Sequence, residues 1–568
     1  MAGVPDRRLD DRRFPRRTML KGGLLVLSGG ITGGLLAACG QSPSQAQPTA
    51  TTADSTSSGT TPAAATQPAS GSSSASPTAS GSATGAGEPK PGGILQGAFE
   101  LDPLSLDPHT NSNFSSLQGF EHCYESLTTY DEEMNVIPAL AEQWEIAEDG
   151  LTYTFTLRPD VKFHNGKTMT GDDVKYSIER VLNPETASPW RSWLSAINEI
   201  TVVEPLLVEM KLSEPYPDLL SSFAAMRASA IIPEGLAEEV NLQTTAVGTG
   251  PFKLVEYVPQ DHITYERFDE YWGQPLPYLD GMVFKILSEE NVRLAALQAG
   301  QIKYAAISAQ GAEQLKNASN IQVLQSPYAW VDLTYVNVSR PPLNDARVRR
   351  AMRVAVNTNE MIQKGVFGAG VPSGPVPTGY GDWYLDPESL PYLEPDIEGA
   401  KALLAEAGYA GERLVINCSP QYPDFVANAV VMQQAFQAIG MNVEINQMEW
   451  GAQNAAYNAK DYDLSNSANT FRPGPDGYIY AYFHTDGNLN SGYSNPELDT
   501  LIEQARSTSD HDERVRLYTQ IQQMLLEESP DFWWYVKYNI EAVANDLQGY
   551  VQSFTGRRMF LKQAWLNE

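Results

Sequence analysis

Residues 41–87 constrain the fold of this chain more than any other stretch, because they cannot contribute to a hydrophobic core. They consist almost entirely of Ser, Thr, Ala, Pro, Gly and Gln, with no apolar periodicity. Such a segment buries too little apolar surface to offset the entropy of ordering, so it is predicted to be disordered. A flexible chain of roughly fifty residues reaches about 35–40 Å. The globular part is therefore expected from residue 91 onward, with a tether before it.

The residues before this tether have the order of an export signal. Residues 1–21 contain six Arg and one Lys against three Asp, and residues 22–38 form an uncharged run that includes six Gly. This run is short and glycine-rich for a membrane span, but it suits a cleaved signal peptide. "RRTMLK" (Arg16 to Lys21) resembles the twin-arginine export motif, although Met19 stands where Phe is usual. "LAAC", which ends at Cys39, resembles a lipobox.

The lipobox implies that Cys39 receives a diacylglycerol after cleavage. Each buried CH₂ contributes roughly 0.8 kcal/mol, so two or more acyl chains hold a protein at a bilayer where one chain does not. We expect residues 1–39 to be a lipoprotein signal peptide and residues 40–90 to be a disordered linker. The mature protein would then be anchored at the outer face of the cytoplasmic membrane or in the periplasm. The alternative is an ordinary N-terminal membrane anchor with an incidental cysteine.

Charge and cysteine content argue against several classes of function. Lys plus Arg (39) against Asp plus Glu (69) gives a net charge of −30, which would repel nucleic acid. Cys123 and Cys418 are too far apart for a local disulfide framework, and we expect both to be free, buried thiols. The six histidines are scattered, and no HExxH or CxxC spacing occurs, so neither a metal site nor a cofactor is expected.

At 568 residues the chain exceeds the usual size of one hydrophobic core, so two or more lobes are expected. "GLTYTFTLRPDVKFHNG" (Gly150 to Gly166) alternates apolar and polar residues, which predicts a half-buried strand. The following "TGDDVKYSIERVL" predicts a helix with a capping box at Thr170 and Asp173. Its expected core face consists of Val174, Ile178 and Val181.

Helices and strands continue to alternate in the second half of the chain. Helices are predicted over Phe425 to Gly440 (core face Val426, Val430 and Phe436), after an Asn495 cap with Pro496 at the first position, and over "DHDERVRLYTQIQQMLLEE" (core face Val515, Tyr518, Ile521 and Leu525). Short strands are predicted at Arg413 to Ser419, at Met441 to Gln447 and in "TFRPGPDGY", which begins at Thr470. This alternation indicates open sheets covered by helices, with ligands beyond the carboxyl ends of the strands.

One long segment, "VIPALAEQWEIAEDGLTYTFTLRPDVKFHNGKTMTGDDVKYSIERVLNP" (Val136 to Pro184), resembles the most characteristic part of the family 5 extracellular solute-binding proteins, which serve ABC importers. The resemblance extends over "DPLSLDP" (Asp102 to Pro108), "GTGPFKLVEYVP" (from Gly248), "ERFDEYWG" (from Glu266), "LNDARVRRAMRVAVNTNEMI" (from Leu343), "SNPELDTLIEQA" (from Ser494) and "SPDFWWY". It therefore covers residues 91–568 almost completely.

The resemblance implies an α/β fold of the two-lobed periplasmic-binding-protein type (type II, the large cluster with an extra subdomain). Mixed sheets flanked by helices would enclose a hinged cleft. Lobe I would comprise residues 91–335 with an inserted subdomain, lobe II residues 336–534, and residues 535–568 would return to lobe I. Members of the family carry no catalytic machinery. They bind a small solute as monomers, close on it, and dock on a membrane permease that an ATPase drives.

Closure requires ligand contacts to both lobes, because a ligand that touches only one lobe cannot shift the hinge. Candidate ligand-binding residues are therefore taken from both halves of the chain: Asn113 and Phe114 from lobe I, Trp330 and Asn337 near the crossing, and Trp450, Phe471, Arg472, Asp476 and Tyr478 from lobe II. The competing interpretation is that an aromatic residue belongs to a core and that Asn337 caps a strand.

The segment "TFRPGPDGYIYAYF" is expected to decide specificity. In the dipeptide- and oligopeptide-binding members, an aspartate a few residues before a "DP" or "EP" pairs with the amino terminus of the peptide. Matching Pro475 to that proline places Phe471 at the aspartate position, so the expected carboxylate is missing. Either Asp476 substitutes for it, or Phe471 stacks on a planar or sugar-like ligand while Arg472 binds a carboxylate or phosphate.

An oligopeptide is the expected solute, and an oligosaccharide, an opine-like compound or a nickel chelate near His484 are the alternatives. Two other classes of function compete with a receptor. A secreted hydrolase would need a nucleophile with its base or two catalytic carboxylates, and no G-x-S-x-G elbow occurs. An adhesive lipoprotein would not need a cleft between two lobes.

Removing residues 1–40 is expected to give a soluble protein that still binds its solute, because anchor and tether contribute nothing to the cleft. Membrane fractionation and a binding titration check this. Aggregation or unfolding of the shortened chain without lipid would contradict it.

Overall fold

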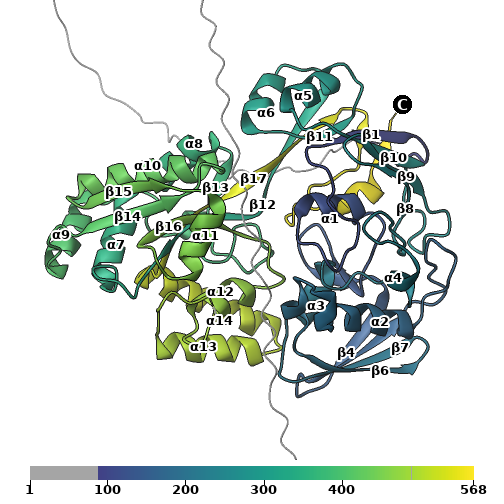
Figure 1. Cartoon of the computed structure of the whole chain (residues 1–568), viewed down its shortest axis with the longest axis horizontal. Coiled ribbons are helices and arrows are strands. Elements are labelled where there is room, and N and C mark those ends of the chain that lie inside the picture. The colour runs from purple at the N-terminus through teal and green to yellow at the C-terminus, as the bar shows by residue number, and fades with distance from the viewer. Residues whose placement is uncertain (1–86, 488, 568) are drawn as a thin grey trace, which may run out of the picture. The chain divides into compact units, whose positions relative to one another are not determined.

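The structure, a computed structural model, describes residues 87–487 and 489–567 (Figure 1). The predictions for the signal peptide, for lipidation at Cys39 and for nearly all of the linker lie outside these residues. The described body has the two-lobed α/β fold that the sequence predicts, with mixed sheets and flanking helices. Within the described ranges, no helix is both long and apolar enough to span a bilayer.

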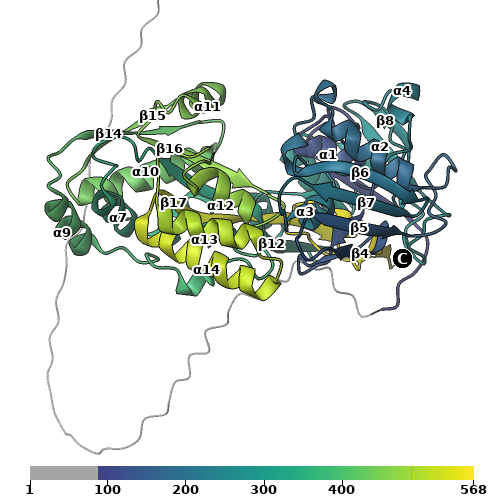
Figure 2. The same ribbon diagram turned by 90° about the horizontal axis from the view of Figure 1, so that it is seen from below.

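One 11-stranded sheet extends through both lobes, and its two longest strands carry the chain between them. β12 (Ile321–Val336) and β17 (Asp531–Ala544) pair antiparallel, from Ile321 opposite Ala544 to Tyr335 opposite Asp531. We call this pair the central ribbon. Figures 1 and 2 show it between the two lobes.

The remaining strands of this sheet lie on either side of the central ribbon. On the side of the second lobe these are β16 (Leu464–Thr470), β14 (Arg413–Cys418) and β15 (Asn442–Gln447), with β13 (Gly370–Pro372) paired to β17. On the side of the first lobe these are β11 (Tyr304–Ala306), β1 (Ile94–Phe99), β10 (Gly281–Ile286), β9 (His262–Arg267) and β8 (Phe252–Val258).

The first lobe contains a second, four-stranded antiparallel sheet (Figure 2). Its strands, in spatial order, are β4 (Ala141–Ile146), β5 (Thr152–Leu157), β7 (Leu207–Leu212) and β6 (Ile197–Glu204), and α2 (Gly171–Leu182) packs on β6 and β7. The apolar side chains of β5 are buried in strict alternation, as predicted. Both hydrogen bonds of the capping box between Thr170 and Asp173 form, and α2 buries the face predicted for it.

Helices cover the sheets in both lobes (Figure 1). In the first lobe they are α1 (Phe114–Phe120), α3 (Leu219–Ala224), α4 (Leu236–Glu239), α5 (Glu290–Gln298) and α6 (Ala309–Leu315). In the second lobe they are α7 (Ala346–Ala355), α8 (Thr358–Val366), α9 (Ile397–Ala407), α10 (Pro423–Ala438), α11 (Trp450–Asn458), α12 (Asp476–Phe483), α13 (Pro496–Ser507) and α14 (His511–Glu528). Short strands pair as β2 (Thr128–Tyr130) with β3 (Val136–Pro138), and β18 (Leu547–Gln548) with β19 (Trp565–Leu566).

Two predicted helices have core faces that differ in part from the prediction. α10 forms where expected, but Val430 is 38% exposed, whereas Phe425 and Ala429 are buried. This helix packs against α8 as well as the sheet, so its buried face follows both neighbours. In α14, Val515 is only half-buried, and Arg514 takes the buried position beside it.

The predicted strand in "TFRPGPDGY" is wrong. β16 ends at Thr470 and α12 begins at Asp476, so the intervening residues form a turn. Pro473 and Pro475 lack the N–H that a strand ladder requires, which explains why the strand stops before them. The cysteine prediction is confirmed, since Cys123 and Cys418 are buried and form no disulfide.

A buried ion pair connects the two lobes. Arg514 of α14 donates to Asp218, which precedes α3, at 2.6 Å, and their side chains are 8% and 4% exposed. A Cβ atom at Gly474 would lie 2.0 Å from the Asp218 carboxylate, so only glycine fits there. The turn after β16 thus packs directly against the first lobe.

Arg514→Met should lower the free energy of unfolding by about 3–5 kcal/mol, because it leaves the buried Asp218 carboxylate without its counter-charge. Chemical denaturation measures this. Arg516→Met is the matched control, since Arg516 pairs with Glu513 on the exposed side of the same helix and is 58% exposed. The control should change stability by no more than about 0.5 kcal/mol. Equal losses in both variants would contradict the assignment.

Candidate functional site

A cavity of about 310 Å³ lies between the lobes, against the central ribbon. Residues of the first lobe, the second lobe, both strands of the ribbon and the C-terminal segment line it together. These residues are Glu100, Ser112, Phe114, Gln118, Arg227, Ala306, Tyr328, Ala329, Trp330, Thr470, Phe471, Asn539, Glu541, Thr555, Gly556 and Arg558. We call this space the main cavity. A ligand in it would contact both lobes at once.

Three of the nominated residues, Phe114, Trp330 and Phe471, line the main cavity from three different parts of the fold. Lys537 Nζ lies 4.6 Å from the centroid of the Trp330 ring, which holds that ring in place by a cation–π contact. Phe471 packs edge-on against Tyr130 of the first lobe, at 6.0 Å between ring centroids. These rings contribute apolar area to the lining of the cavity.

A smaller cavity of about 180 Å³ in the second lobe adjoins the main cavity, because Thr470 lines both. We call it the side cavity. Trp450 and Arg472, two further nominated residues, line it together with Tyr335, Tyr457 and Tyr482. The backbone N–H of Arg472 donates to the hydroxyl of Tyr478 at 3.0 Å. The nominated Tyr478 is itself buried, so it supports Arg472 from behind.

The two nominated asparagines line neither cavity, and Asp476 instead lines, with Arg472, a third cavity of about 540 Å³ between the lobes. The Asp476 carboxylate pairs with Arg506 at 3.2 Å, and burial raises its pKa to about 6. Asn337 is fully buried and donates to the carbonyl groups of Lys460 and Tyr462 at 3.0 Å each, so it fixes a strand end. Asn113 is exposed at the start of α1, between two residues that do line the main cavity.

Sequence reasoning missed the charged residues of the main cavity. Arg227 follows α3 within the mostly apolar stretch "FAAMRASAII" (from Phe223). A single arginine in such a stretch is the one feature of the sequence that could have indicated a role in the cavity. Glu541 accepts hydrogen bonds from Tyr304 (2.5 Å), Tyr550 (2.8 Å) and Gln552 (3.1 Å). The three donors form no recognisable motif with Glu541, so nothing in the sequence marks this carboxylate as part of the cavity lining.

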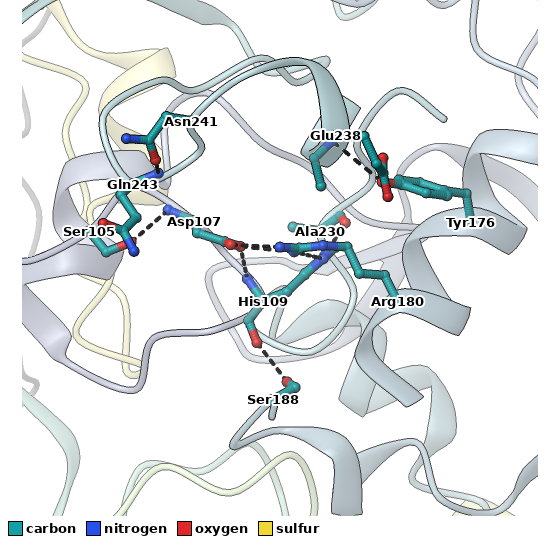
Figure 3. Close-up of polar contacts among 11 residues, drawn as sticks. Ser105, Asp107, His109, Tyr176, Arg180, Ser188, Ala230, Glu238, Asn241 and Gln243 are labelled. Atoms are coloured by element: carbon teal, nitrogen blue, oxygen red, sulfur yellow. Dashed lines mark hydrogen bonds and ion pairs between the residues drawn. The ribbon is translucent and has the colours of Figure 1, made fainter. Parts of the chain in front are cut away.

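A buried polar network connects the segment before α1 with α2 and with the loop after α3 (Figure 3). Arg180 of α2 donates to both carboxylate oxygens of Asp107, at 2.9 and 2.7 Å. Arg180 also donates to Nδ1 of His109 at 2.9 Å, and Nε2 of His109 donates to the carbonyl of Ala230 at 2.8 Å. Ala230 lies three residues after Arg227, so this network connects residues 105–109 to the loop after α3 that carries Arg227.

The network determines the protonation state of His109. Nδ1 accepts from Arg180 and Nε2 donates, which is the neutral imidazole. Burial and the Arg180 guanidinium lower the pKa of His109 from 6.5 to about 4. An unfolded chain therefore binds a proton at His109 between pH 6.5 and 4 that the folded protein does not bind. This group stabilises the fold above pH 6.5, and its contribution is lost as the pH falls toward 4.

His109→Gln tests this, because glutamine can donate and accept at the same places without titrating. The free energy of unfolding of the native protein relative to this variant should fall by about 3 kcal/mol between pH 7 and pH 4. Denaturation series at several pH values measure the difference, and other titrating groups cancel in it. A difference that stays constant over this range would contradict the neutral, buried state of His109.

Comparison with known proteins defines the class to which this site belongs. Residues 135–490 match the model of the bacterial extracellular solute-binding proteins, family 5. The chain is 31% identical to the dipeptide-binding protein of Escherichia coli, over 75% of this chain and 85% of that protein. The chain belongs to family 5 of the extracellular solute-binding proteins, which work with an ABC permease and its ATPase.

Two further relatives show the range of ligands among similar proteins. The chain is 28% identical to the glutathione-binding protein GsiB of Pectobacterium atrosepticum, over 78% of this chain and 89% of that protein. A solved structure of AgaA from Agrobacterium tumefaciens R10 in complex with agropinic acid has a TM-score of 0.68 and 26% identity, over 84% of this chain and 99% of that one. These relatives are binding proteins, not enzymes.

Proposed function

We propose that this protein is the extracytoplasmic receptor of an ABC importer and binds a peptide-like solute in the main cavity by closure of its lobes. The observation that carries the proposal is the cavity itself, since both lobes and the ribbon between them line it. A solute there makes the contacts to both lobes that closure requires. Dipeptide- and glutathione-binding relatives support a peptide-like solute.

An opine-like solute is the second candidate, and the complex of AgaA with agropinic acid favours it. The flat rings of Phe114, Trp330 and Phe471 suit a planar or cyclic ligand as well as a peptide. An oligosaccharide fits the same rings. A nickel chelate has less support, because His484 is buried and near Glu503 rather than in either cavity. Hydrolysis and adhesion have no support among the relatives.

The division of the chain also forms part of the proposal. Residues 91–335 would form lobe I, residues 336–534 lobe II, and residues 535–568 the return to lobe I. The end of β12 at Val336 and the start of β17 at Asp531 support these boundaries. The protein would act as a monomer, held outside the cytoplasm by lipid on Cys39 after export by a twin-arginine signal.

Native mass spectrometry of the protein purified without denaturation, followed by calorimetry with glutathione and alanyl dipeptides, tests the function. Saturable binding without turnover is expected. Trp330→Ala should weaken it by at least about tenfold, because buried aromatic anchors carry much of the binding energy. Trp144→Ala, a half-buried tryptophan in β4 outside both cavities, should leave the affinity unchanged. Turnover, or no binding of any small solute, would contradict the proposal.

A further inference from the structure

The first lobe contains a cavity of its own, apart from the cavities described above. Its volume is about 280 Å³, and it is lined by residues between 121 and 272 and by residues of the C-terminal segment between 557 and 562. We call it the first-lobe cavity. Within the described part of the chain, none of its lining residues also lines the main cavity, the side cavity or the third cavity. A ligand held here contacts one lobe only, so it is not the solute on which the lobes close.

The cavity reaches the surface beside the short hairpin of β2 and β3. Thr129 and Ile137 lie opposite each other in this hairpin, and both line the cavity. Ile137 is 36% exposed, and its neighbour Pro138 is exposed as well. Deeper in the cavity, the lining includes the buried side chains of Met226 and Met559. An apolar path therefore leads from the rim into the first lobe.

The charges around the first-lobe cavity do not cancel. The charged side chains that line it are Glu121, Glu125, Arg158, Arg557 and Lys562. His122 also lines it, but burial and the nearby arginines lower its pKa to about 3, so its ring is neutral. Glu121 and Arg557 form an ion pair at 3.3 Å. Two cations then remain against the single carboxylate of Glu125, which leaves one positive charge in excess.

The Glu125 carboxylate is held by donors of the protein itself. It accepts hydrogen bonds from the hydroxyl groups of Thr249 at 3.0 Å and Tyr271 at 2.7 Å, and from the indole N–H of Trp272 at 2.7 Å. Both of its oxygens accept, as an ionised carboxylate does. Burial raises the pKa of Glu125, and the charge of Lys562 together with these donors opposes the rise.

The two remaining cations lie beside this carboxylate without an ion pair. Among residues 87–487 and 489–567, neither Arg158 nor Lys562 pairs with a carboxylate. Arg158 donates to the carbonyl of Ala139 at 2.5 Å, and its guanidinium carbon lies 4.6 Å from the ring centroid of Trp272, the indole that donates to Glu125. Burial lowers the pKa of Lys562, and the attraction of Glu125 opposes this only in part. An anion beside Lys562 would supply the missing counter-charge.

We propose that the first-lobe cavity is a second binding site, which takes a small organic acid with one negative charge and an apolar body. The acid group lies beside Lys562 and Arg158, which offer charged N–H donors. The body packs against Ile137, Met226 and Met559. This inference goes beyond the proposed function and does not depend on it.

Size and charge restrict the ligand further. An apolar cavity of about 150 Å³ holds benzene, so about 280 Å³ is enough for a molecule of the size of benzoate or hexanoate. One negative charge cancels the excess, whereas an ammonium group would add to it. Inorganic phosphate has no apolar body and leaves the apolar part of the lining without a partner.

Calorimetry on the full chain with matched probes tests the inference. The probes are benzoate and hexanoate, their neutral amides, benzylamine and inorganic phosphate. The acids should bind saturably with one molecule per chain, about 10- to 100-fold more tightly than the amides. Benzylamine and phosphate should bind no more tightly than the amides. Bound benzoate should leave the radius of gyration unchanged, because it contacts one lobe only.

Variants place the probe and separate a binding role from a structural one. Lys562→Met should weaken benzoate binding by about 10- to 100-fold and leave benzamide binding unchanged, and Lys562→Arg should recover most of the loss. Lys316→Met, which removes the same charge from an exposed lysine paired with Glu313, is the matched control and should have no effect. Thr129→Trp, which fills the cavity from its half-buried rim, should abolish binding of acid and amide alike. Trp330→Ala, in the main cavity, should leave benzoate binding unchanged.

Several results would overturn the inference. Equal affinity for acid and amide would remove the role of the charge, and absence of saturable binding for every probe would mean that the cavity holds only water. Loss of benzoate binding in Trp330→Ala but not in Thr129→Trp would place the probe in the main cavity. A loss in Lys562→Met that follows a lower melting temperature, without recovery by arginine, would make Lys562 structural. None of these results changes the test of the proposed function, which measures peptide-like solutes in the main cavity.

Discussion

The antiparallel pairing of β12 with β17 is the constraint on which the rest of this structure depends. The chain passes from the first lobe to the second in β12 and returns in β17, so the strands that the 11-stranded sheet contributes to each lobe flank one ribbon. The register shifts between Pro327 and Val331, where Tyr328 and Trp330 line the main cavity. The cavity therefore lies at the point where the two lobes meet the element that joins them.

Charged side chains of the central ribbon next to the main cavity have buried partners, which keep them in place. Lys537 of β17 lies between Asp332 and Asp424 and below the ring of Trp330. Glu541 lies four residues further along β17 and accepts hydrogen bonds from the hydroxyl groups of Tyr304 and Tyr550. These charged groups therefore already have partners within the protein, an ion pair for Lys537 and hydrogen bonds for Glu541.

The sequence was sufficient for features whose determinants are local. The alternation in β5, the capping box at Thr170 and the Asn495–Pro496 helix start all depend on residues within a few positions of one another, and all are confirmed. The resemblance to family 5 likewise rests on contiguous segments, and it gives the two-lobed fold. Among the nominated site residues, five line the two cavities: Phe114, Trp330, Trp450, Phe471 and Arg472.

Features that depend on distant partners were not predictable in the same way. β16 has the polar sequence "LSNSANT", yet it is buried, because Thr334 of β12 donates to Asn466 at 2.7 Å and Gln453 donates to Ser465 at 2.9 Å. Read alone, it has no strand pattern. Arg227, which the sequence analysis did not nominate, lines the main cavity. Asn337, which it did nominate, instead supports a strand end.

Small-angle X-ray scattering of the soluble protein with and without saturating solute tests the central claim, which is closure of two lobes on a ligand held between them. The account predicts a smaller radius of gyration in the bound state, under conditions where calorimetry shows a saturated single site. An unchanged radius of gyration at saturation would mean that the solute binds without bringing the lobes together, and would contradict the account.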